Sequence, residues 1–109
     1  MNYKYGEFSE NQIQETKQKM RKQIFFLLLC VDPKTKNHYT NVNVNEVFEN
    51  VLTLFGGLNE LLSYPQELVD VMSLIEAAKH TYNTQPFNWL KYRKDILDAG
   101  HLVLSIKEV

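Results

Sequence analysis

Helix-starting motifs recur along this chain, and each precedes apolar residues that are spaced three or four positions apart. Ser9 and Gln12 form a capping box, in which the two side chains bind free backbone N–H groups of a first helical turn, and Asn43 and Glu46 repeat the pattern. Asn88 is placed to cap a further helix. Because the apolar spacing has the period of an α-helix, the sequence predicts an all-α fold.

Glycine, proline and asparagine indicate where these helices begin and end. Asp32-Pro33 stops the first helix before a polar linker. Gly56-Gly57 is the expected breaker of the second helix, and Leu58 to Leu62 can add one further turn after it. Pro65 suits the first turn of a third helix, for which Ser63 is the predicted cap, and Asn83 can close that helix in the left-handed conformation. The predicted helices cover residues 10–31, 44–56, 65–83 and 89–107.

The 109 residues, 44% hydrophobic and 23% charged, predict one folded domain over 1–109, a small bundle or hairpin of about four helices. The run Ile24–Val31 is apolar on every helical face, and Leu90, Leu97 and Leu104 form a second apolar stripe on the last helix. This is more apolar surface than a 109-residue monomer covers conveniently. We therefore expect a homo-oligomer.

The apolar run Ile24–Val31 also bears on location, because basic residues precede it as in a secretion signal. It is too short to span a bilayer, and it ends in a turn rather than in a small-residue cleavage site. The single cysteine, Cys30, lies inside this run, where an inert buried thiol is expected. These features predict a cytoplasmic protein with no membrane partner.

Residues that could carry catalysis or bind a metal are sparse. Glu76 with His80, and Asp98 with His101, have the helical spacing of a metal half-site, but the motifs of a di-metal bundle are missing and surface pairs are expected. No serine elbow or phosphate-binding glycine loop is present, so we expect neither an enzyme nor a cofactor. A net charge of −1, from 12 basic and 13 acidic residues, argues against nucleic acid as the partner.

Aromatic and basic residues nevertheless gather locally in two places. Lys17 and Arg21 lie one turn apart on the flank of the first apolar stripe, in a helix that Tyr5 closely precedes. Trp89 is followed by basic residues up to Lys94. A nucleotide uses such groups, since its base stacks on aromatic rings and its phosphate accepts charge-assisted hydrogen bonds. The alternative is a pair of solvated helix faces.

The two ends of the chain carry motifs that can be compared with a known family. Tyr5-Gly6-Glu7-Phe8-Ser9-Glu10-Asn11-Gln12-Ile13 is similar to a Tyr-x-x-Leu-Ser-x-x-Glu-Ile start, and Trp89-Leu90, Lys94, Leu97, Gly100, Leu102 and Leu104 to a Trp-Leu, basic, Leu, Gly, Met, Leu series. Both patterns resemble the helical-hairpin sponges of phages, the anti-CBASS and anti-Thoeris proteins that sequester cyclic nucleotide messengers. Residues 32–85 depart from that family, and Ile106-Lys107 replaces its arginine near the end.

The resemblance implies a non-catalytic protein in the infected bacterium, which holds a cyclic nucleotide or a cyclic ADP-ribose-type ligand in pockets between subunits. Tyr5 would stack a base, and Arg21 and Lys94 would contact phosphates, with Lys17 and Trp89 as further candidate ligand-binding residues. The family's basic residue in the first helix is offset by one position from Arg21. The alternative function is a small helical adaptor, inhibitor or immunity protein that acts by protein–protein binding.

Overall fold

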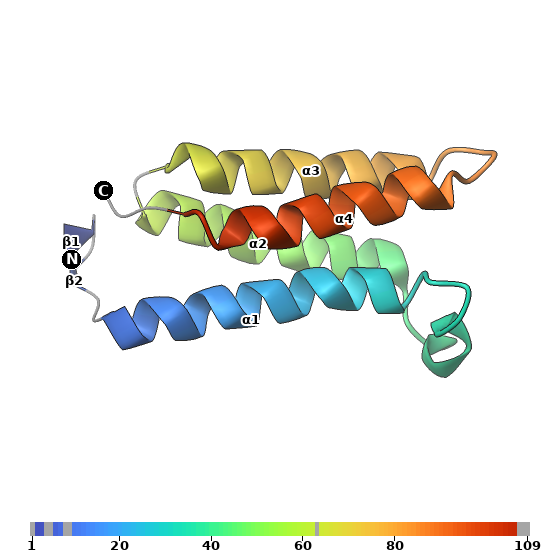
Figure 1. Cartoon of the computed structure of the whole chain (residues 1–109), viewed down its shortest axis with the longest axis horizontal. Coiled ribbons are helices and arrows are strands. Elements are labelled where there is room, and N and C mark those ends of the chain that lie inside the picture. Colours follow the sequence, from blue (N-terminus) through green and yellow to red (C-terminus); the bar gives the residue numbers. More distant parts are fainter. Residues whose placement is uncertain (1, 4–5, 8–9, 63, 107–109) are drawn as a thin grey trace.

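The computed structural model, which describes residues 2–3, 6–7, 10–62 and 64–106, forms an up-down-up-down four-helix bundle (Figure 1). This confirms the all-α prediction over that part of the chain. A short antiparallel hairpin, which pairs Tyr3 with Gly6, precedes the bundle and was not predicted. The elements are β1 (Asn2–Tyr3), β2 (Gly6–Glu7), α1 (Glu10–Leu29), a 3₁₀ turn η1 (Lys36–Tyr39), α2 (Val44–Leu61), α3 (Gln66–Tyr82) and α4 (Trp89–Val103).

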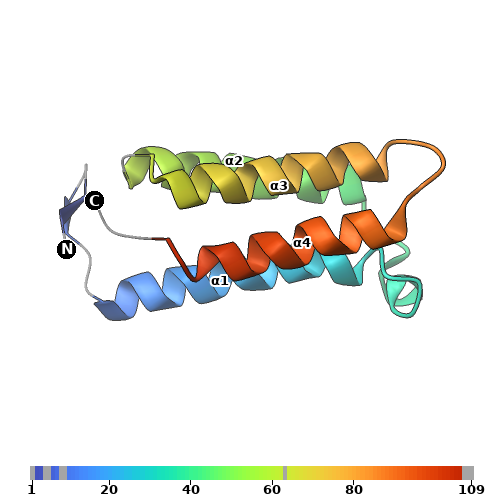
Figure 2. The same ribbon diagram turned by 45° about the horizontal axis from the view of Figure 1, so that its top comes forward.

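The helices are arranged in two layers, with α2 and α3 in one and α1 and α4 in the other (Figure 2). The contact between α3 and α4 is the most extensive, and α1 packs on α4 and α2 on α3. The contact between α1 and α2 is much smaller. The bundle is therefore loosest along the seam between its first two helices.

Tyr92 of α4 lies at the centre of the core and is fully buried. Its ring contacts those of Phe48, Phe87 and Trp89 at centroid distances of 6.2, 5.6 and 6.0 Å. Its hydroxyl donates a 2.6 Å hydrogen bond to the backbone carbonyl of Leu27, which links α4 to α1. The other hydrophobic residues with no exposed surface are Ile24, Leu27, Phe48, Phe55, Leu68, Val71, Ile75, Ala78, Ile96, Ala99 and Val103.

Two of the predicted helix caps are confirmed by their hydrogen bonds. The Asn43 side chain accepts from the backbone N–H of Glu46 at 3.2 Å, and the Asn88 side chain accepts from that of Lys91 at 3.1 Å. Each bond satisfies a first-turn N–H group that has no partner within its helix. The first predicted cap, Ser9, lies outside the described residues, although α1 begins directly after it.

The predicted end of the second helix at Gly56-Gly57 is wrong, because α2 continues through both glycines to Leu61. Phe55 is fully buried, and Leu58 and Leu62 pack against the core just after the glycines. Burial of these side chains outweighs the cost of about 1 kcal/mol that a glycine adds inside a helix. Tertiary packing has therefore decided where this helix ends.

The predicted ends of the first and last helices are also too late. After Leu29, at the end of α1, the carbonyl of Leu28 accepts from the N–H groups of both Val31 and Asp32, and the Thr35 hydroxyl donates to the Leu29 carbonyl at 2.6 Å. This tight turn ends the helix ahead of the proline at residue 33. After Val103, the end of α4, bonds between residues three apart replace the helical pattern.

Both ends of α3 differ from the prediction. Pro65 is the N-cap residue rather than part of the first turn, and Ser63, the predicted cap, lies outside the described residues. Asn83 is not left-handed, since its φ is −92°. Its amide instead donates to the Lys79 carbonyl and forms a reciprocal pair with the Asn45 amide, at 2.8 and 3.1 Å. Asn83 therefore ties the end of α3 to the start of α2.

The second apolar stripe of the last helix is partly uncovered within one chain. Leu90 and Leu104 are 75% and 54% exposed, and Leu97 is half-buried. The homo-oligomer stays a prediction that light scattering at micromolar concentration tests, with a 12.8 kDa monomer as the contradicting result. Among the described helices, none has both the length and the hydropathy needed to cross a membrane.

Two glycines within helices provide a matched pair of substitutions. A Cβ at the buried Gly100 would lie 3.0 Å from Cε1 and Cζ of Phe25, whereas a Cβ at Gly57 would meet no atom within 4 Å. We expect Gly100→Ala to destabilise the protein by about 1–2 kcal/mol through overpacking, and Gly57→Ala to stabilise it by about 0.5–1 kcal/mol through helix propensity. Urea unfolding measures both changes, and equal or greater stability of Gly100→Ala would contradict the packing argument.

Candidate ligand-binding site

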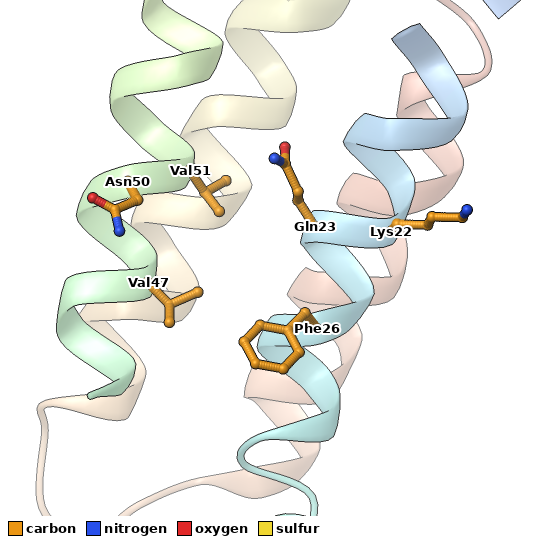
Figure 3. Close-up of a pocket in the computed structure, with 6 residues that line it drawn as sticks. All are labelled: Lys22, Gln23, Phe26, Val47, Asn50 and Val51. Atoms are coloured by element: carbon orange, nitrogen blue, oxygen red, sulfur yellow. The ribbon is translucent and has the colours of Figure 1, made fainter. Parts of the chain in front are cut away.

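A groove follows the loose seam between α1 and α2 (Figure 3). It has a volume of about 310 Å³, at the lower end of the range of roughly 300–1,000 Å³ found for small-molecule sites. Such a volume suits one small planar group with its substituents. The groove is lined by Lys22, Gln23 and Phe26 from α1 and by Val47, Asn50 and Val51 from α2.

The helical period explains why these residues line the groove. On α1, Ile24 and Leu27 are fully buried, and each step along a helix turns the side chain by about 100°. Gln23 and Phe26, each one residue earlier, therefore lie beside the buried stripe, on the flank that faces α2. On α2, the buried Phe48 has Val47 on the corresponding flank. The groove thus forms between α1 and α2, where the side chains that flank the buried residues of each helix do not fill the space between the two helices.

The side chains in the groove divide into a floor and two rims. Gln23, Phe26, Val47 and Val51 point into the space between the helices, whereas Lys22 and Asn50 point outward from its two sides (Figure 3). The floor therefore combines an aromatic ring and aliphatic groups with one amide. An exposed lysine and a second amide stand at its edges.

Two details of the floor are relevant to binding. Oε1 of Gln23 is buried and has no hydrogen-bond partner. The Phe26 ring packs edge-to-face with the ring of Tyr39 in η1, at a centroid distance of 5.3 Å. Because η1 follows the end of α1, Tyr39 holds the Phe26 ring at one end of the groove. The groove lining thus includes an aromatic ring and, one turn earlier on α1, an acceptor that lacks a donor.

The chemistry that these six residues offer is that of binding. An aromatic ring can stack on a planar ligand, an amide can donate and accept hydrogen bonds, and an ammonium group can pair with an anion. The lining includes no carboxylate, hydroxyl, thiol or imidazole. Groups of these kinds bind planar, anionic molecules.

The structure places Lys17 and Arg21 on the opposite flank of α1, toward α4. The Arg21 guanidinium lies 5.3 Å from the centre of the Phe25 ring, and Phe25 packs against Gly100 of α4. Nε of Arg21 is buried and has no hydrogen-bond partner, and Lys17, one turn earlier, is half-buried. Arg21 therefore remains a candidate contact for an anion, but it lies away from the groove.

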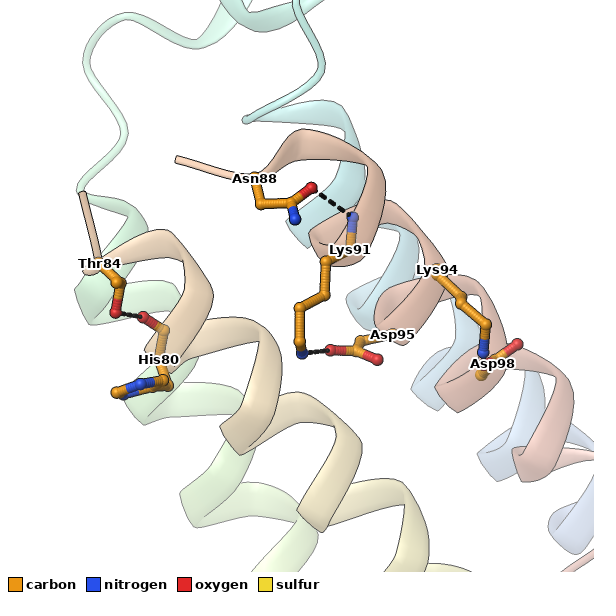
Figure 4. Close-up of polar contacts among 7 residues, drawn as sticks. All are labelled: His80, Thr84, Asn88, Lys91, Lys94, Asp95 and Asp98. Atoms are coloured by element: carbon orange, nitrogen blue, oxygen red, sulfur yellow. Dashed lines mark hydrogen bonds and ion pairs between the residues drawn. The ribbon is translucent and has the colours of Figure 1, made fainter. Parts of the chain in front are cut away.

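Trp89 and Lys94 occupy different surroundings on α4. Trp89 is half-buried and stacks on Tyr92 with an angle of 25° between the ring planes, so its ring supports the core. Lys94 is exposed and pairs with Asp98 at 2.7 Å (Figure 4), and this hydrogen-bonded carboxylate raises the pKa of Lys94. A phosphate at Lys94 would have to compete with Asp98.

Of the predicted ligand-binding residues that the structure describes, those on α1 and Trp89 of α4 do not come together within one chain. Trp89 precedes Gly100 by eleven residues, which is about 16 Å along α4, and Gly100 lies at the level of Phe25, next to Arg21. Tyr5 lies outside the described residues. The pocket between subunits that the family resemblance implies therefore stays a prediction.

The other groups considered for chemistry are structural or exposed. Cys30 is buried as expected, and desolvation raises the pKa of its thiol, which keeps it protonated. Glu76 and His80 are exposed on α3, and Asp98 of the second pair is bound by Lys94. In the part of the chain that the structure describes, no three histidine, cysteine, aspartate or glutamate residues gather as a metal site would require.

The groove residues were not identified from the sequence. One signal was available, because Gln23 and Phe26 lie beside the core stripe at a spacing of one turn. That spacing shows that both residues share a flank, but not which helix lies opposite or how closely it packs. Lys22 is one of the basic residues that precede the apolar run Ile24–Val31, and its position in the sequence does not place it at a groove.

Comparison with known proteins finds no match to the chain among family models, curated proteins or solved structures.

Proposed function

We propose that this protein binds a cyclic nucleotide messenger and sequesters it without altering it. The observation that carries the proposal is the groove between α1 and α2, which places an aromatic ring and an amide in its floor and a lysine on its rim. The resemblance of both chain ends to cyclic nucleotide sponges supports the same function. In the infected bacterium, such a protein would withhold the messenger from the effector of an antiphage system.

Each part of a nucleotide has a matching group in or beside the groove. The base stacks on Phe26, which Tyr39 holds in place from the side. The flexible stem of Lys22 lets its ammonium group turn from the rim toward a phosphate. Given the groove volume of about 310 Å³, one nucleotide unit lies inside, and the rest of a cyclic messenger extends over the rim. Arg21, whose Nε has no partner, is available on the other flank of α1 for a second phosphate.

Loss of the rim lysine is expected to weaken binding selectively. We expect Lys22→Ala to reduce the affinity for the bound messenger by about 10- to 150-fold, because one charge-assisted hydrogen bond contributes about 1.5–3 kcal/mol. Thermal shift against cyclic di- and trinucleotides and cyclic ADP-ribose isomers identifies the ligand, and calorimetric titration measures the affinities. Lys34→Ala is the matched control, since Lys34 is an exposed lysine in the loop after α1 and does not line the groove.

Further variants separate the groove from the residues that the family resemblance indicates. If Tyr5→Ala, Arg21→Ala or Lys94→Ala weakens binding and Lys22→Ala does not, the protein is a sponge whose site is not the groove. If the wild type binds no messenger in the panel, sequestration is wrong and the protein-binding adaptor replaces it. Recovery of intact ligand after heat denaturation separates sequestration from cleavage, because a hydrolase would return a linear product.

A further inference from the structure

We infer that Gln23 makes the groove selective for adenine, the purine base that carries its exocyclic amino group at position 6. This inference rests on the proposed function, because it names the part of the ligand that the groove reads. The observation behind it is the Gln23 amide, whose Oε1 is buried in the floor of the groove without a hydrogen-bond donor.

Because the acceptor of Gln23 is unpaired, rotation of its side chain toward a hydrogen-bond donor on a bound ligand is favourable. A buried carbonyl oxygen that lacks a donor is unfavourable compared with one that is hydrogen-bonded. Gln23 is half-buried and borders the open groove, so rotation of its side chain brings the amide to the space that a ligand would fill. A ligand that donates a hydrogen bond to Oε1 is therefore favoured over a ligand that presents an acceptor there.

The position of Gln23 relative to Phe26 fits recognition of a base edge. The two residues are three positions apart on α1, so their side chains project from the same flank. A base stacked on Phe26 presents its edge, rather than its face, to the neighbouring amide. A glutamine amide pairs bidentately with adenine, accepting from the N6 amino group and donating to N7. Hypoxanthine carries an oxygen at position 6, which would place two acceptors against each other.

Adenosine 5′-monophosphate and inosine 5′-monophosphate are the matched probes, because their bases differ in having an amino group or an oxygen at position 6. We expect wild-type protein to bind the adenine nucleotide about 5- to 150-fold more tightly in calorimetric titration, which is the range for one bidentate amide–base pair. In Gln23→Met, which keeps a similar shape without the amide, the ratio of the two affinities is expected to approach one. Gln18→Met, at an exposed position of α1 outside the groove lining, is the control and should keep the wild-type ratio.

The stability of Gln23→Met gives a second readout that does not depend on ligand. Removal of a buried acceptor without a partner is expected to leave the melting temperature unchanged or higher, so that the variant remains folded for titration. Equal binding of the two nucleotides by the wild type would overturn the inference and leave sequestration standing, as would a preference that persists in Gln23→Met. Failure of the wild type to bind any nucleotide, cyclic messengers included, would overturn both.

Discussion

Replacing Phe48 by alanine is expected to lower the free energy of unfolding by about 3–5 kcal/mol. Phe48 has no exposed surface, and its ring packs against those of Tyr82 and Tyr92 at centroid distances of 6.3 and 6.2 Å. The truncation removes these contacts and leaves a cavity where three helices meet. Since a domain of this size is stable by about 5–15 kcal/mol in total, the variant would lose a large share of its stability. Urea unfolding followed by circular dichroism measures the change.

Leu54→Ala is the matched control for this substitution. Leu54 lies on the same helix as Phe48 but is 45% exposed, so its truncation removes less buried surface and leaves no closed cavity. We expect it to cost less than about 1 kcal/mol. Similar losses at the two positions would mean that α2 does not face the core as described.

Stability is expected to fall steeply above about pH 10, because Tyr92 keeps its proton in the folded protein. Burial raises the pKa of Tyr92 far above its ordinary value, and the charges of Cys30 and Tyr82 add to the shift. In the unfolded chain, Tyr92 loses its proton near pH 10, so the folded state binds more protons above that pH. The contribution of Tyr92 to the free energy of unfolding is therefore fully present below pH 10. Above pH 10 this contribution decreases by about 1.4 kcal/mol per pH unit.

The variant Tyr92→Phe separates this contribution from other alkaline effects. Without the hydroxyl that donates to the Leu27 carbonyl, we expect a loss of about 1–2 kcal/mol at pH 8. Between pH 10 and pH 12, however, the variant should lose about 2–2.5 kcal/mol less than the wild type. Burial also raises the pKa of Cys30, so this thiol too destabilises the fold at alkaline pH, beginning near pH 8.5. This effect is common to the wild type and Tyr92→Phe.

Urea midpoints measured at several pH values test this prediction. Tyr64→Phe is the control, because Tyr64 is 60% exposed, and it should keep the wild-type dependence on pH. An equally steep decline in Tyr92→Phe would show that the Tyr92 phenol does not control alkaline unfolding.

The helix positions were largely predictable because their signals are local. The Asn43 and Asn88 caps bind N–H groups three residues ahead, so the sequence contains both partners of each bond. The errors lie where a distant partner intervenes. Gly56 and Gly57 remain helical because neighbouring leucines pack against the core, and Asn83 avoids the left-handed conformation because its amide bonds to Asn45.

The candidate site was much less predictable, because it depends on the space between helices. Helical spacing places Gln23 and Phe26 on one flank of α1 and separates them from Arg21, but the same spacing is compatible with any neighbouring helix on that flank. Trp89 has a role that the sequence does not reveal, since this candidate ligand-binding residue stacks on Tyr92. This role follows from the packing of α4 against α1 and α3.

Local hydrogen bonds and the period of the apolar residues are thus encoded within short stretches of the chain, and they specify an all-α fold and most helix limits. The pairing of helices depends on contacts between residues that are far apart in sequence. Only the tertiary structure decides that α1 packs closely on α4 and loosely on α2, and this difference opens the groove beside Gln23 and Phe26. A groove is space that side chains leave unfilled, so it can be located only once the arrangement of the helices is known.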